Sequence, residues 1–308
     1  MLLKGPQLKD TFTFDLTFTS SARNAWLAIL RHQALLKHRP INLLVPAYIG
    51  QSNNESGIFD PIRSTLSSYE FYPVSDRLVP DMSAIEESIL QGEIDLLLIV
   101  HYFGFVRADL AKLKTLCSTN GVLLVEDCAH CCFTPTNQAG SVGDFSYYSL
   151  HKFFPTETGG ILRSNCSTSS ASLVDENARC KIDVLEQISR TDITAVIQKR
   201  RDNYQYLENA IINVRGITPF WKLDTRTIPH DFPILVSDNR RENLYFHLKD
   251  RGLVTIALYY RLVDEIDAQL YPASFGVSNN ILNLPIHQDT SRQDLDALVY
   301  EIGQFIES

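Results

Sequence analysis

Apolar and polar residues follow one another along the chain in blocks that predict strands and helices in alternation. Short runs rich in apolar and aromatic residues are typical of strands buried in a parallel sheet. Such runs occupy residues 41–45, 69–74, 95–100, 122–125, 145–150 and 160–163. Segments of helical composition lie between several of them, at residues 22–30, 83–91 and 108–119. This alternation predicts an α/β fold with a mostly parallel sheet.

The two ends of the chain extend this pattern. Residues 11–19 alternate polar and apolar side chains, which is typical of a strand. Ser20 and Ser21 stand before the first predicted helix, where serine is a favourable N-cap and free backbone N–H groups bind phosphate well. Towards the C-terminus, the pattern predicts a strand at residues 232–236 and helices at residues 193–212, 240–250 and 292–305.

Charge and hydropathy exclude several classes of protein. The 308 residues carry a formal net charge of −8, so binding to nucleic acid phosphates is not expected. The start of the chain, MLLKGPQLKD, lacks the pattern of a signal peptide. No apolar run approaches the roughly 20 residues of a transmembrane helix. We therefore expect a cytoplasmic protein that binds neither nucleic acid nor a membrane.

Cysteine and histidine cluster in one short segment, at Cys128, His130, Cys131 and Cys132. A second Cys/His pair at zinc-binding spacing is not found nearby, and buried free cysteine is common. We interpret these residues as structural thiols and expect no metal site. Six cysteines in a chain of this length do not indicate a disulfide framework, which fits a reducing compartment.

Two charged residues follow neighbouring predicted strands. Asp127 comes after the run 122–125, and Lys152 comes after the run 145–150. Ligands of parallel sheets bind beyond the carboxyl ends of the strands, so the carboxylate and the amine should meet at one edge. Taken singly, the two residues fit a helix cap and a solvated surface lysine. Together they suit pyridoxal 5′-phosphate (PLP), which forms a Schiff base with a lysine and needs an acidic partner for its ring nitrogen.

A longer set of residues around this pair resembles the DegT/StrS-type aminotransferases. These are fold-type-I PLP enzymes that mostly aminate keto-sugars attached to nucleotides. The family pattern runs E-D-x-A-[HQ], G-x-x-G-D, an aromatic residue with serine, the lysine, and Gly-Gly. The chain matches it at Glu126, Asp127, Ala129, His130, Gly140, Gly143, Asp144, Tyr148, Ser149, Lys152, Gly159 and Gly160. Weaker matches are HYFG at 101–104, RRDNYQYL at 200–207 and LPIH at 284–287.

The resemblance implies a fold-type-I PLP-dependent transferase with two domains. The large PLP-binding domain would span residues 1–205, and a smaller C-terminal α/β domain would span residues 206–308. Members of the family work as homodimers with active sites at the subunit interface, so a homodimer is expected. The family's G-x-N-[YF]-R loop, which reaches the partner's active site, is not found in residues 164–190.

The resemblance also implies which residues act on the cofactor. Lys152 would carry PLP and move a proton during the reaction, and Asp127 would pair with the ring nitrogen. The remaining cofactor contacts would come from Ala129 under the ring, His130 on the phenolic oxygen, and Ser149, Ala22 and Arg23 on the phosphate. The family also places a stacking side chain after a proline, but the equivalent position here falls at Ile49–Gly50, which cannot stack. Tyr48 is a possible substitute, although core packing suits it better.

The function implied is amino transfer from an amino acid, such as glutamate, to a keto-sugar nucleotide in surface-polysaccharide or amino-sugar biosynthesis. Two alternatives stay open. One is a PLP-binding regulatory protein without transaminase activity, because the partner loop and the stacking residue are missing. The other is a PLP-dependent sugar dehydratase, because His151 lies beside Lys152 and some relatives carry histidine at the lysine position. A dinucleotide enzyme is disfavoured because SSARNA lacks the G-x-G-x-x-G glycines.

Overall fold

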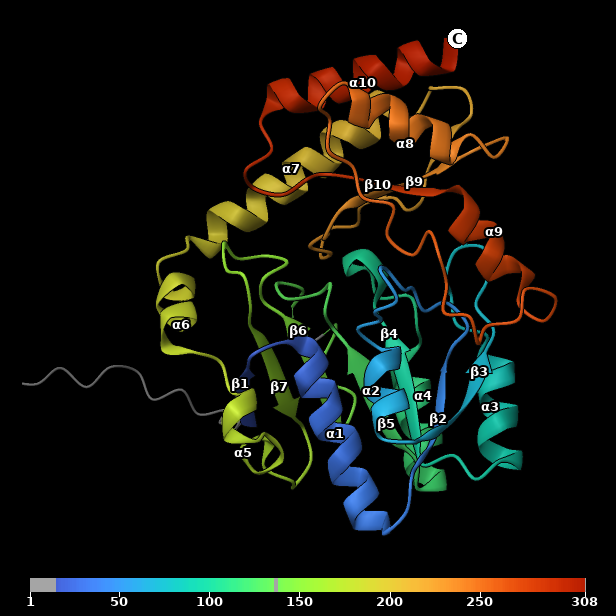
Figure 1. Cartoon of the computed structure of the whole chain (residues 1–308), viewed down its shortest axis with the longest axis vertical. Helices are drawn as coiled ribbons and strands as arrows, with labels where there is room; N and C mark the ends of the chain where they lie inside the picture. The colour runs from blue at the N-terminus through green and yellow to red at the C-terminus, as the bar shows by residue number, and fades with distance from the viewer. Residues whose placement is uncertain (1–14, 136–137, 308) are drawn as a thin grey trace, which may run out of the picture.

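A seven-stranded sheet forms the larger part of the molecule. The computed structural model describes residues 15–135 and 138–307 (Figure 1). The strand order is β1-β7-β6-β5-β4-β2-β3, and the strands are β1 (Asp15–Thr19), β2 (Asn42–Pro46), β3 (Ser68–Tyr72), β4 (Leu96–Val100), β5 (Leu123–Asp127), β6 (Phe145–Ser149) and β7 (Gly160–Ser164). Strands β2 to β6 pair in parallel, and β7 runs antiparallel to both of its neighbours. The predicted α/β fold with a mostly parallel sheet is confirmed.

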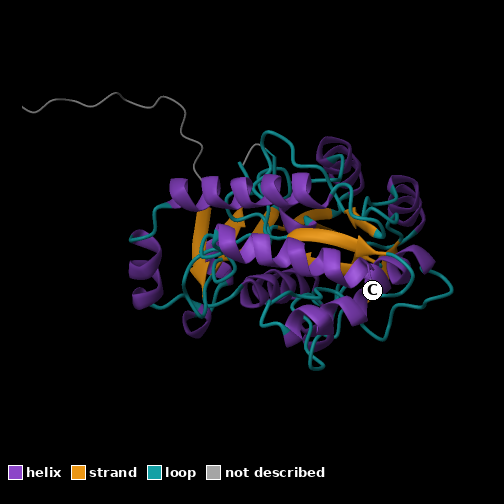
Figure 2. Ribbon diagram, turned by 90° about the horizontal axis from the view of Figure 1, so that it is seen from above, coloured by secondary structure: helices purple, strands orange, loops and turns teal. Residues whose placement is uncertain are grey.

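Helices lie on both sides of this sheet (Figure 2). The helices of this part of the chain are α1 (Ala22–Lys37), α2 (Phe59–Ser64), α3 (Met82–Gln91), α4 (Leu110–Asn120), α5 (Ser170–Leu173) and α6 (Ile182–Ser189). Their ends follow local sequence signals. The Ser21 side chain accepts the N–H of Asn24 at the start of α1. Gly121 adopts the left-handed conformation, with a φ of 68°, at the end of α4.

A smaller antiparallel sheet forms the C-terminal part, above the large sheet in Figure 1. Its strand order is β10-β9-β8, with β8 (Ile217–Pro219), β9 (Phe232–Val236) and β10 (Ile281–Leu284). Around it lie α7 (Ile193–Ile211), α8 (Arg241–Asp250), α9 (Pro272–Asn280) and α10 (Arg292–Glu307). The predicted domain boundary after residue 205 falls inside α7, so the division at that residue stays a prediction.

The predicted elements differ from the observed ones mainly at their ends. Of the strand predicted at residues 11–19, the structure describes residues 15–19, and residues 11–14 lie outside the described part. Several observed elements were not predicted, because they are short or carry a weak apolar stripe: helices α2, α5, α6 and α9 and strands β8 and β10. Among the helices of the described residues, none combines the length and the apolar character needed to cross a membrane.

The core of the large sheet fixes where α1 begins. Strand β4 is buried along its whole length, and Trp26 of α1 is fully buried, with its indole N–H donating to the carbonyl of Ile58 at 3.0 Å. The Trp26 ring also stacks on Tyr147 of β6, with 5.7 Å between the ring centroids. These contacts bring the N-terminal turn of α1 against the start of β7. At that point Gly160 meets the backbone of Ser21 so closely that an added Cβ would lie 2.5 Å from the Ser21 carbonyl carbon.

Gly160→Ala should therefore destabilise the protein. The atoms that the new methyl group would meet belong to backbone, and forced overpacking of this kind costs about 1–3 kcal/mol. Chemical denaturation of the two proteins measures the difference. Gly303→Ala on α10 is the control, because no atom lies within 4 Å of its added Cβ, and it should be neutral or stabilising. Equal stability of the Gly160→Ala protein and the wild type would contradict the close approach.

Candidate active site

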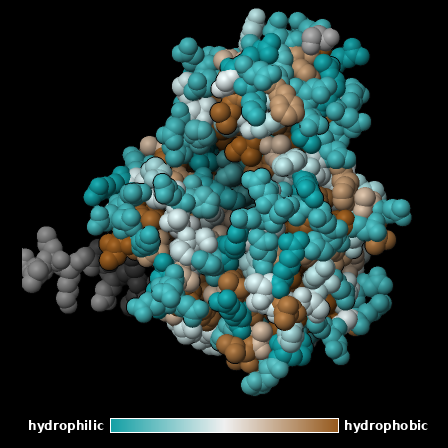
Figure 3. Space-filling view, in the orientation of Figure 1, coloured by the Kyte–Doolittle hydropathy of each residue, from teal (hydrophilic) through white to brown (hydrophobic). Residues whose placement is uncertain are grey.

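A cavity of about 1280 Å³ lies at the carboxyl ends of β4, β5 and β6, between the large sheet and the C-terminal part. Figure 3 shows the surface hollowed between these two parts of the molecule. Every residue predicted to bind the cofactor lines this cavity: Ala22, Arg23, Asp127, Ala129, His130, Ser149 and Lys152. The structure therefore brings together residues that come from three separate segments of the chain, at the start of α1 and at the ends of β5 and β6.

Asp127 stands at the last position of β5 and is 5% exposed. Its Oδ1 atom accepts the backbone N–H of Ala129 at 2.8 Å. Burial raises the pKa of the Asp127 carboxyl, and this N–H and the nearby Lys152 amine oppose that rise. The carboxylate is therefore held in a fixed direction, where a cationic ligand group would stabilise its charge.

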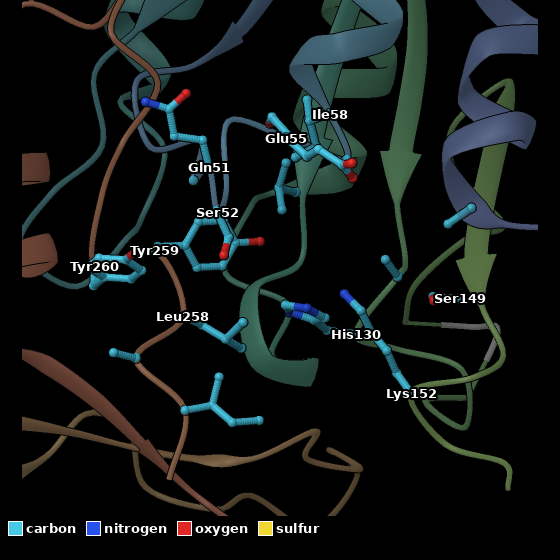
Figure 4. A pocket seen from close by; sticks show the side chains of 18 of the residues that line it. Gln51, Ser52, Glu55, Ile58, His130, Ser149, Lys152, Leu258, Tyr259 and Tyr260 are labelled. Carbon is cyan, nitrogen blue, oxygen red and sulfur yellow. The ribbon is translucent and has the colours of Figure 1, made fainter. Parts of the chain in front are cut away.

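Lys152 follows β6 on a turn, and its side chain reaches into the cavity beside His130 (Figure 4). Its Nζ atom forms no hydrogen bond or ion pair with any residue in the ranges 15–135 and 138–307. Burial lowers the pKa of the Lys152 amine, while Asp127 and Asp231 raise it. A lysine with a lowered pKa has a larger neutral fraction, and the neutral amine is the form that attacks a carbonyl carbon.

The backbone of the Lys152 turn is held by a buried arginine on α7. Arg200 is 2% exposed, and its Nη2 donates to the Lys152 carbonyl at 3.0 Å. Its Nη1 donates to the carbonyl of His230 at 2.8 Å, and its guanidinium lies 4.7 Å from the centroid of the Phe153 ring. Burial lowers the pKa of Arg200 to about 10. This residue thus ties the lysine turn to the C-terminal part of the chain.

His130 has a defined tautomer. It is 3% exposed, and its Nδ1 accepts the backbone N–H of Phe103 at 3.1 Å. Nδ1 therefore carries no proton, so in the neutral ring Nε2 carries the proton and is the donor atom. Burial lowers the pKa of His130 well below its usual value, which keeps the ring neutral. The ring stacks on His230 at 4.5 Å between centroids. A neutral donor fixed in this way suits an oxygen acceptor in the cavity.

The N-terminus of α1 lies on the side of the cavity that Ser149 and His151 also line. The Ser149 hydroxyl and His151 Nδ1 are 3.2 Å apart. The backbone N–H groups of a first helical turn attract anions. The Arg23 guanidinium, however, hydrogen-bonds Glu55 at 3.2 Å and lies 3.8 Å from Asp60. Arg23 would therefore contribute its backbone N–H rather than its charge to an anion held here.

Glu126 organises the turn beside the cavity, a role that the motif alone did not reveal. It is fully buried, and its two oxygens accept N–H groups from Gly140 at 2.8 Å, Val142 at 3.0 Å and Gly143 at 2.7 Å. His101 Nε2 lies 2.9 Å from the same carboxylate. These donors lower the pKa of Glu126 against the effect of burial. The family match Gly140–Gly143 thus reflects a backbone loop wrapped around one buried charge.

The cysteines of this region are free, and Cys128 and Cys131 are buried. Burial raises the pKa of both thiols, which makes them unreactive. His101, Glu126 and Cys128 bring potential metal ligands within 4.8 Å of one another. The Glu126 oxygens are already occupied by the four donors named above. The expectation that no metal binds here stays a prediction.

Comparison with known proteins adds to this geometry. A model of the DegT/DnrJ/EryC1/StrS aminotransferase family matches residues 73–170. Over that range, the chain carries the sequence signature of this family. The resemblance inferred from the motifs is confirmed. A comparison with the curated proteins gave no match.

Solved structures of other proteins share the fold of this chain, and the three named next each match 95% of it. They are the aminotransferase TlmJ from Streptoalloteichus hindustanus (19% identity, 86% of its chain, TM-score 0.78), PseC from Helicobacter pylori, an aminotransferase involved in the biosynthesis of pseudoaminic acid (16%, 86%, 0.80), and Spr1654 from Streptococcus pneumoniae in its PLP form (18%, 87%, 0.77). At these identities the likeness shows the fold.

The residues of the cavity fit PLP, the cofactor expected from the motifs. The buried Asp127 carboxylate suits the protonated ring nitrogen, and the unpaired Lys152 amine suits the aldehyde. His130 offers a fixed N–H for the phenolic oxygen, and α1 with Ser149 offers donors for the phosphate. Tyr48 is fully buried and packs against Tyr102 and Tyr259, so the core interpretation of this residue is the one that the structure supports.

Several residues of the C-terminal part also line the cavity, and the sequence pattern did not reveal them. They lie on α8 and in the segment 255–261 and include Arg241, Tyr245, Tyr259, Tyr260 and Arg261. The family motifs matched in the sequence include none of these cavity residues. The adjacent Tyr259 and Tyr260 are visible in the sequence, but only the fold shows that they line the same cavity as Asp127.

The reaction of the apoprotein with PLP should report the pKa of Lys152. The rate should rise with pH as the amine loses its proton, with a midpoint below the ordinary lysine value of 10.5, because burial lowers this pKa. In Asp127→Asn the midpoint should fall further, because the carboxylate that raises the pKa is gone. Stopped-flow absorbance at a series of pH values measures both midpoints. A wild-type midpoint at 10.5 or above, or an upward shift in the variant, would contradict this assignment.

Proposed function

We propose that this chain is a PLP-dependent aminotransferase that moves an amino group from an amino acid to a keto-sugar nucleotide. The observation that carries the proposal is the placement of the unpaired Lys152 amine and the buried Asp127 carboxylate in one cavity, next to a helix N-terminus. The matched family is described as an aminotransferase family. Among the structures of the same fold, Spr1654 has been solved in PLP and PMP forms.

Each residue would have a defined task. When bound, PLP supplies an electron-accepting ring that stabilises negative charge on the substrate α-carbon. Asp127 would keep the ring nitrogen protonated, since a fixed buried carboxylate favours a cation beside it. Lys152 would hold the cofactor and, once released, move a proton between the donor α-carbon and the cofactor C4′ atom. Its lowered pKa suits that transfer near neutral pH.

The sugar nucleotide is proposed as acceptor because the cavity extends well beyond the cofactor residues. A volume of about 1280 Å³ exceeds what PLP needs. The lining outside the cofactor residues includes Arg241, which suits a phosphate group, and the aromatic side chains of Tyr245 and Phe246. PseC and TlmJ, which share the fold, are named as aminotransferases. Glutamate is proposed as the amino donor, and amino-sugar or surface-polysaccharide biosynthesis in the cytoplasm as the setting.

We also propose that the working unit is a homodimer. Two-fold dimers are the commonest oligomers, and fold-type-I relatives build their sites from two chains. In this chain, the region from residue 165 to residue 190 forms α5 and α6, and Ile182 on α6 is 75% exposed. Sedimentation of the active protein tests the dimer. A fully active monomer at assay concentration would show that one chain builds the whole site.

The proposed activity is tested by loading the protein with PLP and adding glutamate. Conversion of the cofactor to the PMP form indicates an aminotransferase, and return to the PLP form with one member of a panel of keto-sugar nucleotides identifies the acceptor. A protein that binds PLP but never converts it would instead be a regulatory PLP-binding protein. Release of water from the sugar without net amino transfer would indicate a dehydratase.

Two substitutions should abolish most of this conversion. Lys152→Ala should slow it by at least about a hundredfold, because the proton-transfer group is lost. Asp127→Asn should slow it by roughly 10²–10³-fold, because the fixed negative charge at the ring nitrogen is lost. Lys112→Ala on α4 is a matched control, since this lysine is 54% exposed and pairs only loosely with Glu86, at 3.6 Å. Single-turnover absorbance measures all three, and near-normal rates in either site variant would contradict the assigned role.

A further inference from the structure

We propose that the ring of Tyr259, from the C-terminal part of the chain, forms the wall against which the flat face of the PLP ring packs. This inference rests on the proposed function and assigns a cofactor contact that the sequence motifs do not contain. It places one wall of the cofactor site outside the large sheet. In Figure 4, Tyr259 and Lys152 lie on either side of His130.

The position of the Tyr259 ring depends on a glycine that lies directly against it. Gly50 follows β2, and an added Cβ there would lie 2.5 Å from Tyr259 Cδ1 and 3.1 Å from Tyr259 Cα. Any side chain at residue 50 would therefore overlap the tyrosine. The space that a side chain at residue 50 would fill is occupied by the Tyr259 ring. The Tyr259 ring, from another segment of the chain, thus takes the place of the stacking side chain that is missing at Ile49–Gly50.

The backbone around Tyr259 is fixed from both parts of the molecule. Tyr259 has a φ of 59°, in the left-handed region that a bulky residue seldom adopts. The hydroxyl of Ser278, which is 2% exposed, donates to the Tyr259 carbonyl at 2.6 Å. The N–H of Gln51 donates to the carbonyl of Arg261 at 3.0 Å, and the N–H of Val263 donates to the carbonyl of Ile49 at 2.9 Å. Strain held in place by such bonds is typical of functional sites.

Aromatic neighbours support the ring and leave part of it facing the cavity. Tyr48 packs at 5.1 Å with an interplanar angle of 35°, and Tyr102 packs edge-on at 5.7 Å. The Tyr259 side chain is only half-buried, and the part that these neighbours leave uncovered lines the cavity together with Asp127 and Lys152. Burial and the nearby Asp127 raise the pKa of the Tyr259 hydroxyl, so the ring stays neutral. A neutral, supported ring suits stacking against a flat cationic heterocycle.

The test is a titration of PLP into the apoprotein of the wild type, of three site variants and of one control variant, followed by absorbance. Tyr259→Leu should raise the dissociation constant of PLP by about tenfold, since ring stacking is lost. Tyr259→Phe should stay within about threefold of the wild type, because the ring remains. Gly50→Ala, which displaces the ring without removing it, should also weaken binding by about threefold or more. Tyr300→Leu on α10 is the control, since Tyr300 is 64% exposed and lies outside the cavity.

The outcomes separate this inference from the proposed function. If the wild type fails to bind PLP, the proposed function falls, and this inference falls with it. If the wild type binds PLP and Tyr259→Leu binds it equally well, only this inference is overturned. If Tyr259→Phe loses as much affinity as Tyr259→Leu, the hydroxyl carries the contact and the stacking role is wrong. Thermal denaturation monitored by circular dichroism identifies any unfolded variant. If Tyr259→Leu does not fold, the PLP affinity of Gly50→Ala provides the test: weaker binding supports the stacking role, and unchanged binding overturns it.

Discussion

A half-buried lysine and a buried carboxylate share one cavity in this protein without pairing with each other. Among the described residues, Lys152 has no ion-pair partner, yet each of the two groups shifts the pKa of the other. A direct ion pair would raise the pKa of the lysine and remove its nucleophilicity. Separation leaves room between them for a flat ring that can satisfy both groups. The other features of the site keep these two side chains apart and correctly directed.

Three buried contacts provide that support. Glu126 gathers the backbone of residues 140–143 around one carboxylate, next to the strand that ends in Asp127. Arg200 holds the carbonyl of Lys152 from the C-terminal part of the chain. Gly160 lets β7 approach the first turn of α1, where an anion would bind. Each contact joins segments distant in sequence, so the site depends on the complete fold rather than on the motif segment alone.

The sequence predicted most of the sheet and the polar side of the site, for physical reasons that particular residues illustrate. The run before Asp127 is short and wholly apolar, which is typical of a strand buried on both faces of a parallel sheet, and the structure shows such a strand there. Gly121 ends α4 because glycine readily adopts the left-handed conformation, and Ser21 begins α1 because its side chain accepts a backbone N–H of the first turn. Short helices such as α6, and the contact between Gly50 and Tyr259, could not be predicted. They arise from packing between distant segments, which leaves no pattern of apolar and polar residues in the local sequence.

The central claim is that Lys152 is the residue that carries PLP. The most direct test is to reduce the PLP-loaded protein with borohydride, digest it, and locate the modified peptide by mass spectrometry. The account predicts one pyridoxyl group per chain, on Lys152, and none after Lys152→Ala. A modification on Lys181 or Lys199 instead, or an unchanged yield in the Lys152→Ala protein, would contradict both the assignment and the motif match on which it rests.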